Sequence, residues 1–433
     1  MSAHSQVIRL LQEALGKARL ASRQFDAIMD DDEVPPDQPR RRRRRVPPPP
    51  PPRREPPDPP PPTGDKTVLE GENWVHMTDG VARGAGGGTG HLLMPRADIT
   101  FDNIHFKGAK RSCIFSSAQG YTGALTAPAG DPTLEAYLYD LTVTNSIFDT
   151  REPNTFKHYV DGNDGTLWAS RESGLRNASV VNCTAKDFFG NSYDHDEQHP
   201  LVTQQEGHVL YWVIVPRAGS VYRIEDCHFE NCGGHGLQVM TEWTEAASGS
   251  LPSPIPGEYG KIVLRRNKFI NTDRCPHRGS YTVSLFDPNC SLLVEDCHLE
   301  ANGVYPQWGW DGTPEGAYNA RGLVMMKGAS GDATFRRTTF VQGSKPKKSA
   351  VTIRGPETVT FEDCHMAQGV VKINSLFYYA NQKVETRKVV FSGCTGDAVL
   401  QVGAKVVGRI DEDRVWDLEE LGLLEFPELR HTA

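Results

Sequence analysis

The chain has 433 residues, with 55 acidic and 47 basic side chains and a formal net charge of −8. This modest negative balance favours solubility and carries no general signature of nucleic-acid binding, so a nucleic-acid partner is not expected. No run of about 18 apolar residues occurs in the sequence, so no membrane span is expected.

The first segment, residues 1–29, is predicted to be an amphipathic helix for assembly or docking. From residue 5 onward, apolar side chains recur in alternating steps of four and three, as in a heptad seam. The predicted docking residues are Val7, Leu11, Leu15, Phe25 and Ile28. A lone helix of this kind has no core. It is therefore expected to form a homotrimer, to dock to a larger particle, or to fold back on the rest of the chain.

Residues 30–66 are predicted to be a disordered linker rich in arginine and proline. Six consecutive arginines fill Arg40–Arg45, and polyproline follows at Pro47–Pro52 and Pro59–Pro62. Polyproline forms a semi-rigid helix with a rise of about 3.1 Å per residue, so this segment would act as a spacer. The arginine run is expected to be solvated, although phosphate or an acidic protein surface would also suit it.

Residues 67–410 repeat one motif many times. The segment Tyr222–Asn231 returns as Leu293–Asn302 and Val359–Gln368, and looser copies precede and separate them. Aligning the copies gives one inward position, whose occupants are Ile104, Ser146, Cys183, Cys227, Asn267, Cys297, Thr338, Cys364 and Cys394. Successive occupants are 42, 37, 44, 40, 30, 41, 26 and 30 residues apart. A second inward row follows two residues later and holds Phe106, Phe148, Phe229, Phe269, Leu299, Phe340 and Met366.

Each copy is predicted to contain a short strand, a one-residue corner of Asn, Asp or Arg, and a second strand. Self-similarity at such a period marks a stack of units, none of which buries its apolar face alone. The pattern resembles a right-handed parallel β-helix of the pectate-lyase-like or phage-tailspike-like kind. The expected fold is therefore all-β, a parallel β-helix solenoid preceded by the N-terminal helix and its linker. A β-sandwich with chance similarity is the alternative.

The chain holds nine cysteines, five of them at the inward position, where cysteine serves as a small buried apolar residue. The odd count and the lack of an uninterrupted apolar stretch near the N-terminus favour synthesis in the cytoplasm without a signal peptide. Even so, neighbouring repeats would bring Cys183 to Cys227 and Cys364 to Cys394 within the distance range of a disulfide.

Residues 411–433 are predicted to be a cap helix and tail, because an open β-helix end needs cover. The apolar face of that helix would hold Val415, Trp416, Leu418, Leu421 and Leu424.

Catalytic or binding residues are expected in the loops between repeats, because the residues of the repeats themselves pack against neighbouring repeats. Glycoside hydrolysis needs two carboxylates at a suitable separation. The catalytic candidates are Asp194, Asp196, Glu242 and Asp311. One loop is also dense in metal-capable groups that would fit a divalent cation, although a solvated loop is the favoured alternative. Those groups are Asp194, His195, Asp196 and His199. No other cofactor is expected.

Exposed aromatic side chains beside carboxylates are typical of sugar-binding or partner-binding surfaces. The ligand-binding candidates are Trp168, Trp243, Tyr305, Trp308, Trp310 and His235. His235 stands in a Gly-His-Gly motif like that of polygalacturonases, but Asn271–Asp273 follows it instead of preceding it. The other polygalacturonase motifs and those of pectate lyases are missing.

The layout of helix, stiff tether and repeat region resembles phage tailspike and head-fibre proteins. The resemblance implies a virion-attached fibre, spike or decoration protein that binds carbohydrate on glycan surfaces. A polysaccharide lyase or glycoside hydrolase is one alternative, and a shell-docked cargo or scaffold protein is another. Whether the protein is an enzyme stays open.

Overall fold

The fold is known from a computed structural model, which describes part of the chain and shows only β-strands as regular elements in that part. The described residues are 67–70, 74–77, 82–84, 92–93, 98–107, 114–117, 139–149, 168–186, 209–214, 216, 218–230, 235–241, 259–272, 281–286, 288–301, 322–328, 330–342, 349–373, 376–379 and 382–424. The predicted docking helix and the predicted linker, residues 1–66, lie outside them.

Most strands belong to three parallel ladders, which we call A, B and C. Ladder A has nine short strands. In order, they are β1 (Thr67–Glu70), β6 (Ile104–Lys107), β9 (Ile147–Asp149), β11 (Thr184–Lys186), β14 (His228–Glu230), β17 (Lys268–Ile270), β20 (His298–Ala301), β23 (Thr339–Gln342) and β26 (His365–Met366).

Ladders B and C share the long strand β10 (Trp168–Val181), which pairs with strands of both. Ladder B further contains β4 (Leu92–Leu93), β7 (Ile114–Ser117), β12 (Leu210–Ile214), β15 (Leu237–Thr241), β18 (Tyr281–Phe286), β21 (Gly322–Lys327), β24 (Ser349–Arg354), β27 (Val370–Ile373) and β31 (Val399–Val402). Ladder C further contains β5 (Ile99–Asp102), β8 (Tyr139–Thr144), β13 (Val221–Glu225), β16 (Gly260–Arg265), β19 (Cys290–Glu295), β22 (Ala333–Arg336), β25 (Thr358–Glu362) and β30 (Lys388–Ser392).

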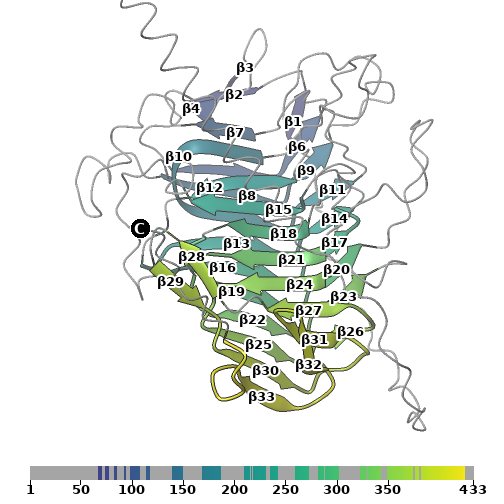
Figure 1. Cartoon of the computed structure of the whole chain (residues 1–433). Coiled ribbons are helices and arrows are strands. Elements are labelled where there is room, and N and C mark those ends of the chain that lie inside the picture. The colour runs from purple at the N-terminus through teal and green to yellow at the C-terminus, as the bar shows by residue number, and fades with distance from the viewer. Residues whose placement is uncertain are drawn as a thin grey trace, which may run out of the picture. The chain divides into compact units, whose positions relative to one another are not determined.

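From β12 to β26 the chain visits ladders B, C and A in the same order in every repeat (Figure 1). Each strand pairs in parallel with the equivalent strand of the next repeat, as β13 does with β16 and β16 with β19. The prediction of an all-β fold with parallel sheets is therefore confirmed for the described residues, and the order of the strands is compatible with a solenoid. Two antiparallel hairpins stand apart from the ladders: β2 (Trp74–Met77) with β3 (Ala82–Gly84), and β28 (Leu376–Tyr379) with β29 (Gln382–Glu385).

A one-residue corner joins ladder C to ladder A, as the repeat predicted. Its residues all have positive φ, a left-handed conformation that costs most side chains about 1–2 kcal/mol. They are Asn103, Asn145, Asn182, Asp226, Arg266, Asp296, Arg337, Asp363 and Gly393. Asparagine and aspartate tolerate this conformation because their short polar side chains bond locally. The arginines do not share that property, so their conformation needs another source of stability.

That source is a column of side-chain contacts on the outer side of the corner. Asn182 donates to Asn145 (2.8 Å), whereas Arg266 forms two hydrogen bonds with Asp226 (2.6 and 2.7 Å). Arg337 binds Asp296 in the same two-pronged way (2.6 and 2.9 Å). Bidentate pairs of this kind are the stronger class of ion pair.

The inward position of the repeat lies immediately after this corner. Its occupants from Ser146 to Cys394 are buried, with at most 6% of any of them exposed. Asn267 shows why polar side chains stand there: it accepts from the backbone N–H of Cys227 (2.9 Å) and donates to the Ile224 carbonyl (2.7 Å). Buried backbone groups need such partners, and a larger apolar side chain would leave them unpaired.

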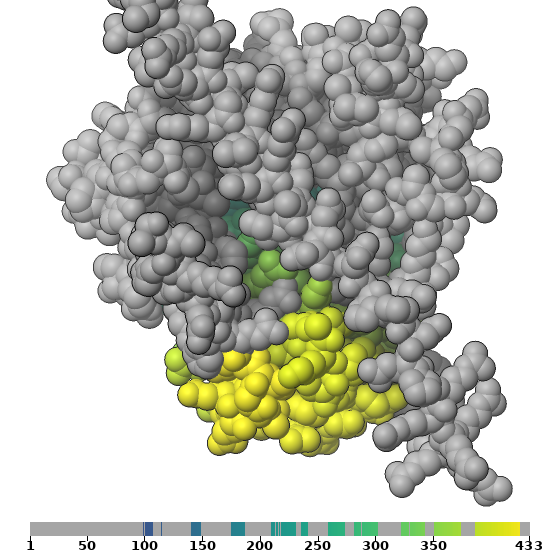
Figure 2. Space-filling model, viewed as in Figure 1, coloured from purple at the N-terminus to yellow at the C-terminus, as the bar shows by residue number. Residues whose placement is uncertain are grey.

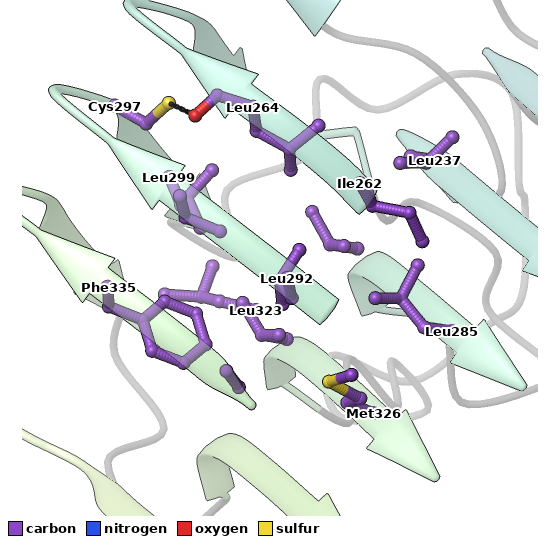
Figure 3. Close-up of a cluster of buried hydrophobic side chains, with 14 of the residues drawn as sticks. Leu237, Ile262, Leu264, Leu285, Leu292, Cys297, Leu299, Leu323, Met326 and Phe335 are labelled. Atoms are coloured by element: carbon purple, nitrogen blue, oxygen red, sulfur yellow. Dashed lines mark hydrogen bonds between the residues drawn. The ribbon is translucent and has the colours of Figure 1, made fainter. Parts of the chain in front are cut away.

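The second inward row and the strands around it form one apolar core. Phe106 stacks on Phe148 with ring centroids 5.1 Å apart, and Phe229 lies 5.4 Å from Phe269. Figure 3 shows part of this core, in which side chains from ladders B and C point toward one another and the Cys297 thiol contacts the Leu264 carbonyl. All seven predicted occupants of this row are buried, so the prediction is confirmed.

The predicted cap helix of residues 411–433 is wrong for the part that the structure describes. Residues Arg414–Asp417 form strand β33, which pairs antiparallel with β30, and β32 (Lys405–Arg409) pairs antiparallel with β31. Trp416 and Leu418 are buried, whereas Val415 is 57% exposed and Leu421 42% exposed. Without β32 and β33, the last strands of ladders B and C would have unpaired backbone edges, and a strand supplies the hydrogen-bond partners that a helix would not.

Six cysteines are described, and all six are free thiols. Within the same residues, no segment qualifies as a membrane-spanning helix.

Candidate functional site

The predicted loop residues attach to ladder B. The segment between β11 and β12 holds Asp194, His195, Asp196 and His199. The segment between β20 and β21 holds Tyr305, Trp308, Trp310 and Asp311. Both segments lead into ladder B strands, whereas Glu242 and Trp243 directly follow β15 and leave from its other end. All these residues lie outside the described part, so their catalytic, metal and ligand roles stay predictions.

Trp168 is the first residue of β10, and its backbone pairs with Ile114 and Leu210 in ladder B. Its side chain lies outside the described part of the structure. Its predicted role in ligand binding therefore stays a prediction, placed on the same ladder.

His235 is the one predicted site residue whose side chain is described. It precedes β15 and is 5% exposed. The backbone N–H of Tyr281 donates to His235 Nδ1 over 2.9 Å, so this nitrogen ties β15 to the start of β18. A side chain used in this way supports the sheet, and its predicted ligand-binding role receives no support from the described geometry.

The glycine after His235 also has a structural reason. A Cβ atom at Gly236 would lie 2.7 Å from the Thr282 carbonyl oxygen and 2.6 Å from Thr272 Oγ1. Real Cβ atoms do not approach backbone so closely, so only glycine fits. The Gly-His-Gly likeness to polygalacturonases is thus explained by packing between β15 and β18.

The outer face of ladder B is the most distinctive surface near these residues. Val283 and Leu285 point into the core, so the alternation of a strand directs Ser284 outward. Register pairing extends this outward row through neighbouring strands. The row consists of Tyr211, Gln238, Ser284, Met325, Thr352, Lys372 and Gln401.

The centre of this face is sheltered from solvent although it points away from the core. Ser284 is fully buried, and Gln238, Met325 and Thr352 are at most 9% exposed. Two side-chain oxygens there, Gln238 Oε1 and Ser284 Oγ, are buried and have no hydrogen-bond partner among the residues that the structure describes. Because register pairing makes Gln238 and Ser284 neighbours, these atoms form a small patch of unused hydrogen-bonding capacity. Buried polar atoms are usually paired in a protein, and these two are among several buried side-chain atoms without a partner in the described residues.

A half-buried margin surrounds this centre. It offers aromatic rings at Tyr211 and Phe286 and cations at Arg354 and Lys372. The Tyr211 hydroxyl contacts Met240 Sδ at 3.3 Å. This combination can stack on a flat apolar ligand surface and pair with a negative charge at the same time.

Ladder A carries a second polar face with a different character. His228, Lys268 and His298 lie side by side in successive strands, and Lys268 is only 8% exposed. Each imidazole lies beside a carboxylate of its own strand: His228 Nε2 is 3.2 Å from Glu230, and His298 Nε2 is 2.8 Å from Glu300. These contacts are internal to the face. No group of three or more metal-binding side chains occurs anywhere in the described residues.

Sequence reasoning missed the outer face of ladder B. The signal was present, because Leu237–Thr241 and Gly322–Lys327 are largely apolar instead of strictly alternating. Parallel strands buried on both faces read in this way.

Comparisons with known proteins identify no relative. No protein-family model matches the chain, and neither the curated proteins nor the solved structures give a significant match.

Proposed function

We propose that the protein is a right-handed parallel β-helix that binds glycans along the outer face of ladder B. The constant order of ladders B, C and A and the parallel pairing of successive repeats support this fold. The handedness follows from the strong preference for right-handed connections between parallel strands.

The observation that supports the binding function is the half-buried margin of this face, where aromatic rings lie on the same ladder as the cations of Arg354 and Lys372. The half-buried rings of Tyr211 and Phe286 offer apolar surface for a sugar ring, and the flanking cations favour an acidic glycan.

The predicted N-terminal helix completes the proposal. Residues 1–29 would attach the protein to a larger particle, such as a virion, and residues 30–66 would hold it away from that particle. In this reading the protein is a fibre, spike or decoration protein. Docking of the same residues to a protein shell, as in a cargo or scaffold protein, is the alternative.

The experiment is a binding measurement of the full chain against neutral and acidic polysaccharides, with variants Lys372→Gln and Lys261→Gln. Lys372 lies on the outer face of ladder B, whereas Lys261 is exposed on ladder C and serves as the matched control. We expect Kd for an acidic polysaccharide to rise about tenfold for Lys372→Gln, roughly the loss of one charge-assisted contact, and to stay constant for the control.

Absence of binding to every polysaccharide, or an equal loss in both variants, would contradict the proposal. The same incubations test the enzymatic alternative. New reducing ends would indicate a hydrolase, and new unsaturated ends would indicate a lyase.

A further inference from the structure

The last two inward cysteines differ from the other cysteine pair in their surroundings. Cys183 and Cys227 occupy successive repeats in the interior of the stack, and both are fully buried. Cys364 and Cys394 also occupy successive repeats, but Cys394 is the last occupant of the inward position and is 6% exposed. The repeat after Cys394 is replaced by the antiparallel strands β32 and β33. Figure 2 shows this C-terminal part, in yellow, as a continuous surface at one end of the described strands.

Backbone pairing brings the two terminal cysteines close together. His365 and Thr395, the residues that follow them, form a parallel bridge, and the Thr395 N–H donates to the Cys364 carbonyl over 2.9 Å. Strands paired in parallel lie about 4.8 Å apart. That spacing falls inside the range of about 4.4 to 6.8 Å between the Cα atoms of a disulfide.

The corner next to Cys394 differs from the others, and its backbone N–H donates to Asp413 Oδ1 over 2.7 Å. It is occupied by Gly393, with φ at 62°, and a side chain there would collide with the Asp363 carboxylate. The corners beside Cys183 and Cys227 are Asn182 and Asp226, each with hydrogen bonds to neighbouring corners. A disulfide needs its Cβ atoms closer than the spacing of parallel strands, so the chain must shift slightly to form one. At Cys394 the chain would shift against the antiparallel strand β33 instead of against a further parallel repeat.

We propose that Cys364 and Cys394 form an oxidation site at the C-terminal end of the stack, closing to a disulfide on reaction with hydrogen peroxide. The Cys394 thiolate attacks one peroxide oxygen, which breaks the O–O bond, forms a sulfenic acid and releases hydroxide. The Cys364 thiol then attacks the sulfenic sulfur, the S–O bond breaks, and the departing hydroxide takes up the thiol proton. Two thiols and one peroxide thus give one disulfide and two waters.

The acidities of the thiols agree with this order of events. The hydrogen bond from Cys364 lowers the pKa of Cys394 to about 7, so much of it is thiolate at neutral pH. Burial raises the pKa of Cys364, which makes it the second thiol to react. Burial likewise raises the pKa of Cys227 in the interior pair and the pKa of Cys290.

The test is peroxide treatment of the reduced full chain, followed by unfolding, alkylation of the remaining thiols and mass spectrometry of the peptides. We expect a Cys364–Cys394 cross-linked peptide to form at least about tenfold faster than oxidation of Cys183 or Cys227. The Cys364→Ser variant should leave Cys394 as a sulfenic acid, which a dimedone-type reagent traps. Serine is a safe replacement, because Ser146 occupies the same position in an earlier repeat.

The matched control is Cys183→Ser, which should not change the rate of the terminal cross-link. Equal oxidation of both pairs, or oxidation of Cys394 to higher acids with no cross-link in the unmodified protein, would overturn the proposal. So would full alkylation of Cys364 and Cys394 after peroxide treatment. None of these outcomes depends on glycan binding, so the experiment tests the oxidation site independently of the proposed function.

Discussion

The corner between ladders C and A and the outer face of ladder B belong to the same repeats. They differ in whether their buried polar atoms form hydrogen bonds. At the corner, buried polar atoms such as those of Asn267 are paired with the backbone. On the outer face of ladder B, the buried oxygens of Gln238 and Ser284 find no hydrogen-bond partner within the described part of the chain. A buried polar side chain stabilises the fold at the corner, where it is hydrogen-bonded. On the outer face of ladder B it lowers the stability, because an unmade buried hydrogen bond carries a desolvation penalty.

The difference indicates what each region is for. Polar side chains that are paired with the backbone at the inward position are part of the architecture. Buried oxygens without a partner among the described residues suggest that something outside the described strands completes their hydrogen bonds.

The largest effect is expected for Asn267→Leu at the corner. The variant removes the partners of the Cys227 N–H and the Ile224 carbonyl in a buried place, so we expect a loss of about 3 kcal/mol in the free energy of unfolding. Urea unfolding followed by circular dichroism measures it. Thr338→Ser is the control, because it keeps the hydroxyl that bonds the Val294 and Arg336 carbonyls and should cost about 1 kcal/mol. Equal stability of Asn267→Leu and the unmodified protein would contradict the account of the corner.

An intermediate effect is expected for Asp296→Asn on the outer side of the corner. The hydrogen bond from Arg337 holds the pKa of Asp296 below its usual value despite partial burial. The folded pKa is thus lower than the unfolded one, and the pair contributes stability above the unfolded value that is lost as pH falls through the folded value. Since the Asp296 side chain is 34% exposed, we expect a loss of only about 1 kcal/mol at neutral pH.

Thermal unfolding of both proteins across pH checks this prediction. The difference should shrink as the pH falls below about 4, where the unfolded carboxyl takes up a proton. Asp397→Asn is the control, because Asp397 is 81% exposed beside Arg409 and should contribute less. A difference between the Asp296→Asn variant and the unmodified protein that stays constant down to pH 3 would show that the ion pair is not its cause.

The smallest effect on stability is expected for Ser284→Ala on the outer face of ladder B. Removing an unpaired buried hydroxyl should leave the free energy of unfolding unchanged or raise it by about 1 kcal/mol. Destabilisation by Ser284→Ala comparable to that of Asn267→Leu would mean that this hydroxyl has a structural partner, and the contrast between the two regions would fail.

Much of the corner could be predicted from the sequence, because its requirements are local and recur. The left-handed residue at Asn182 or Asp226, the buried Cys227 and the aromatic Phe229 all follow from one short pattern. The C-terminal segment could not be predicted in the same way. The apolar residues around Trp416 fit a helical face as well as a strand, and the unpaired edge of β30 decided between them.

The sequence by itself determined the period of the repeat, the two inward rows and the identity of the corner, since each depends on residues a few positions apart. Only the tertiary structure decided which outward faces are sheltered, how His235 is used and how the last repeat ends. Those outcomes depend on contacts with other repeats. The hydrogen-bonding partner of His235, for example, is Tyr281, which lies 46 residues further along the chain. Local periodicity carries no information about contacts at that separation. Hydrogen bonding and burial between repeats therefore determine these features.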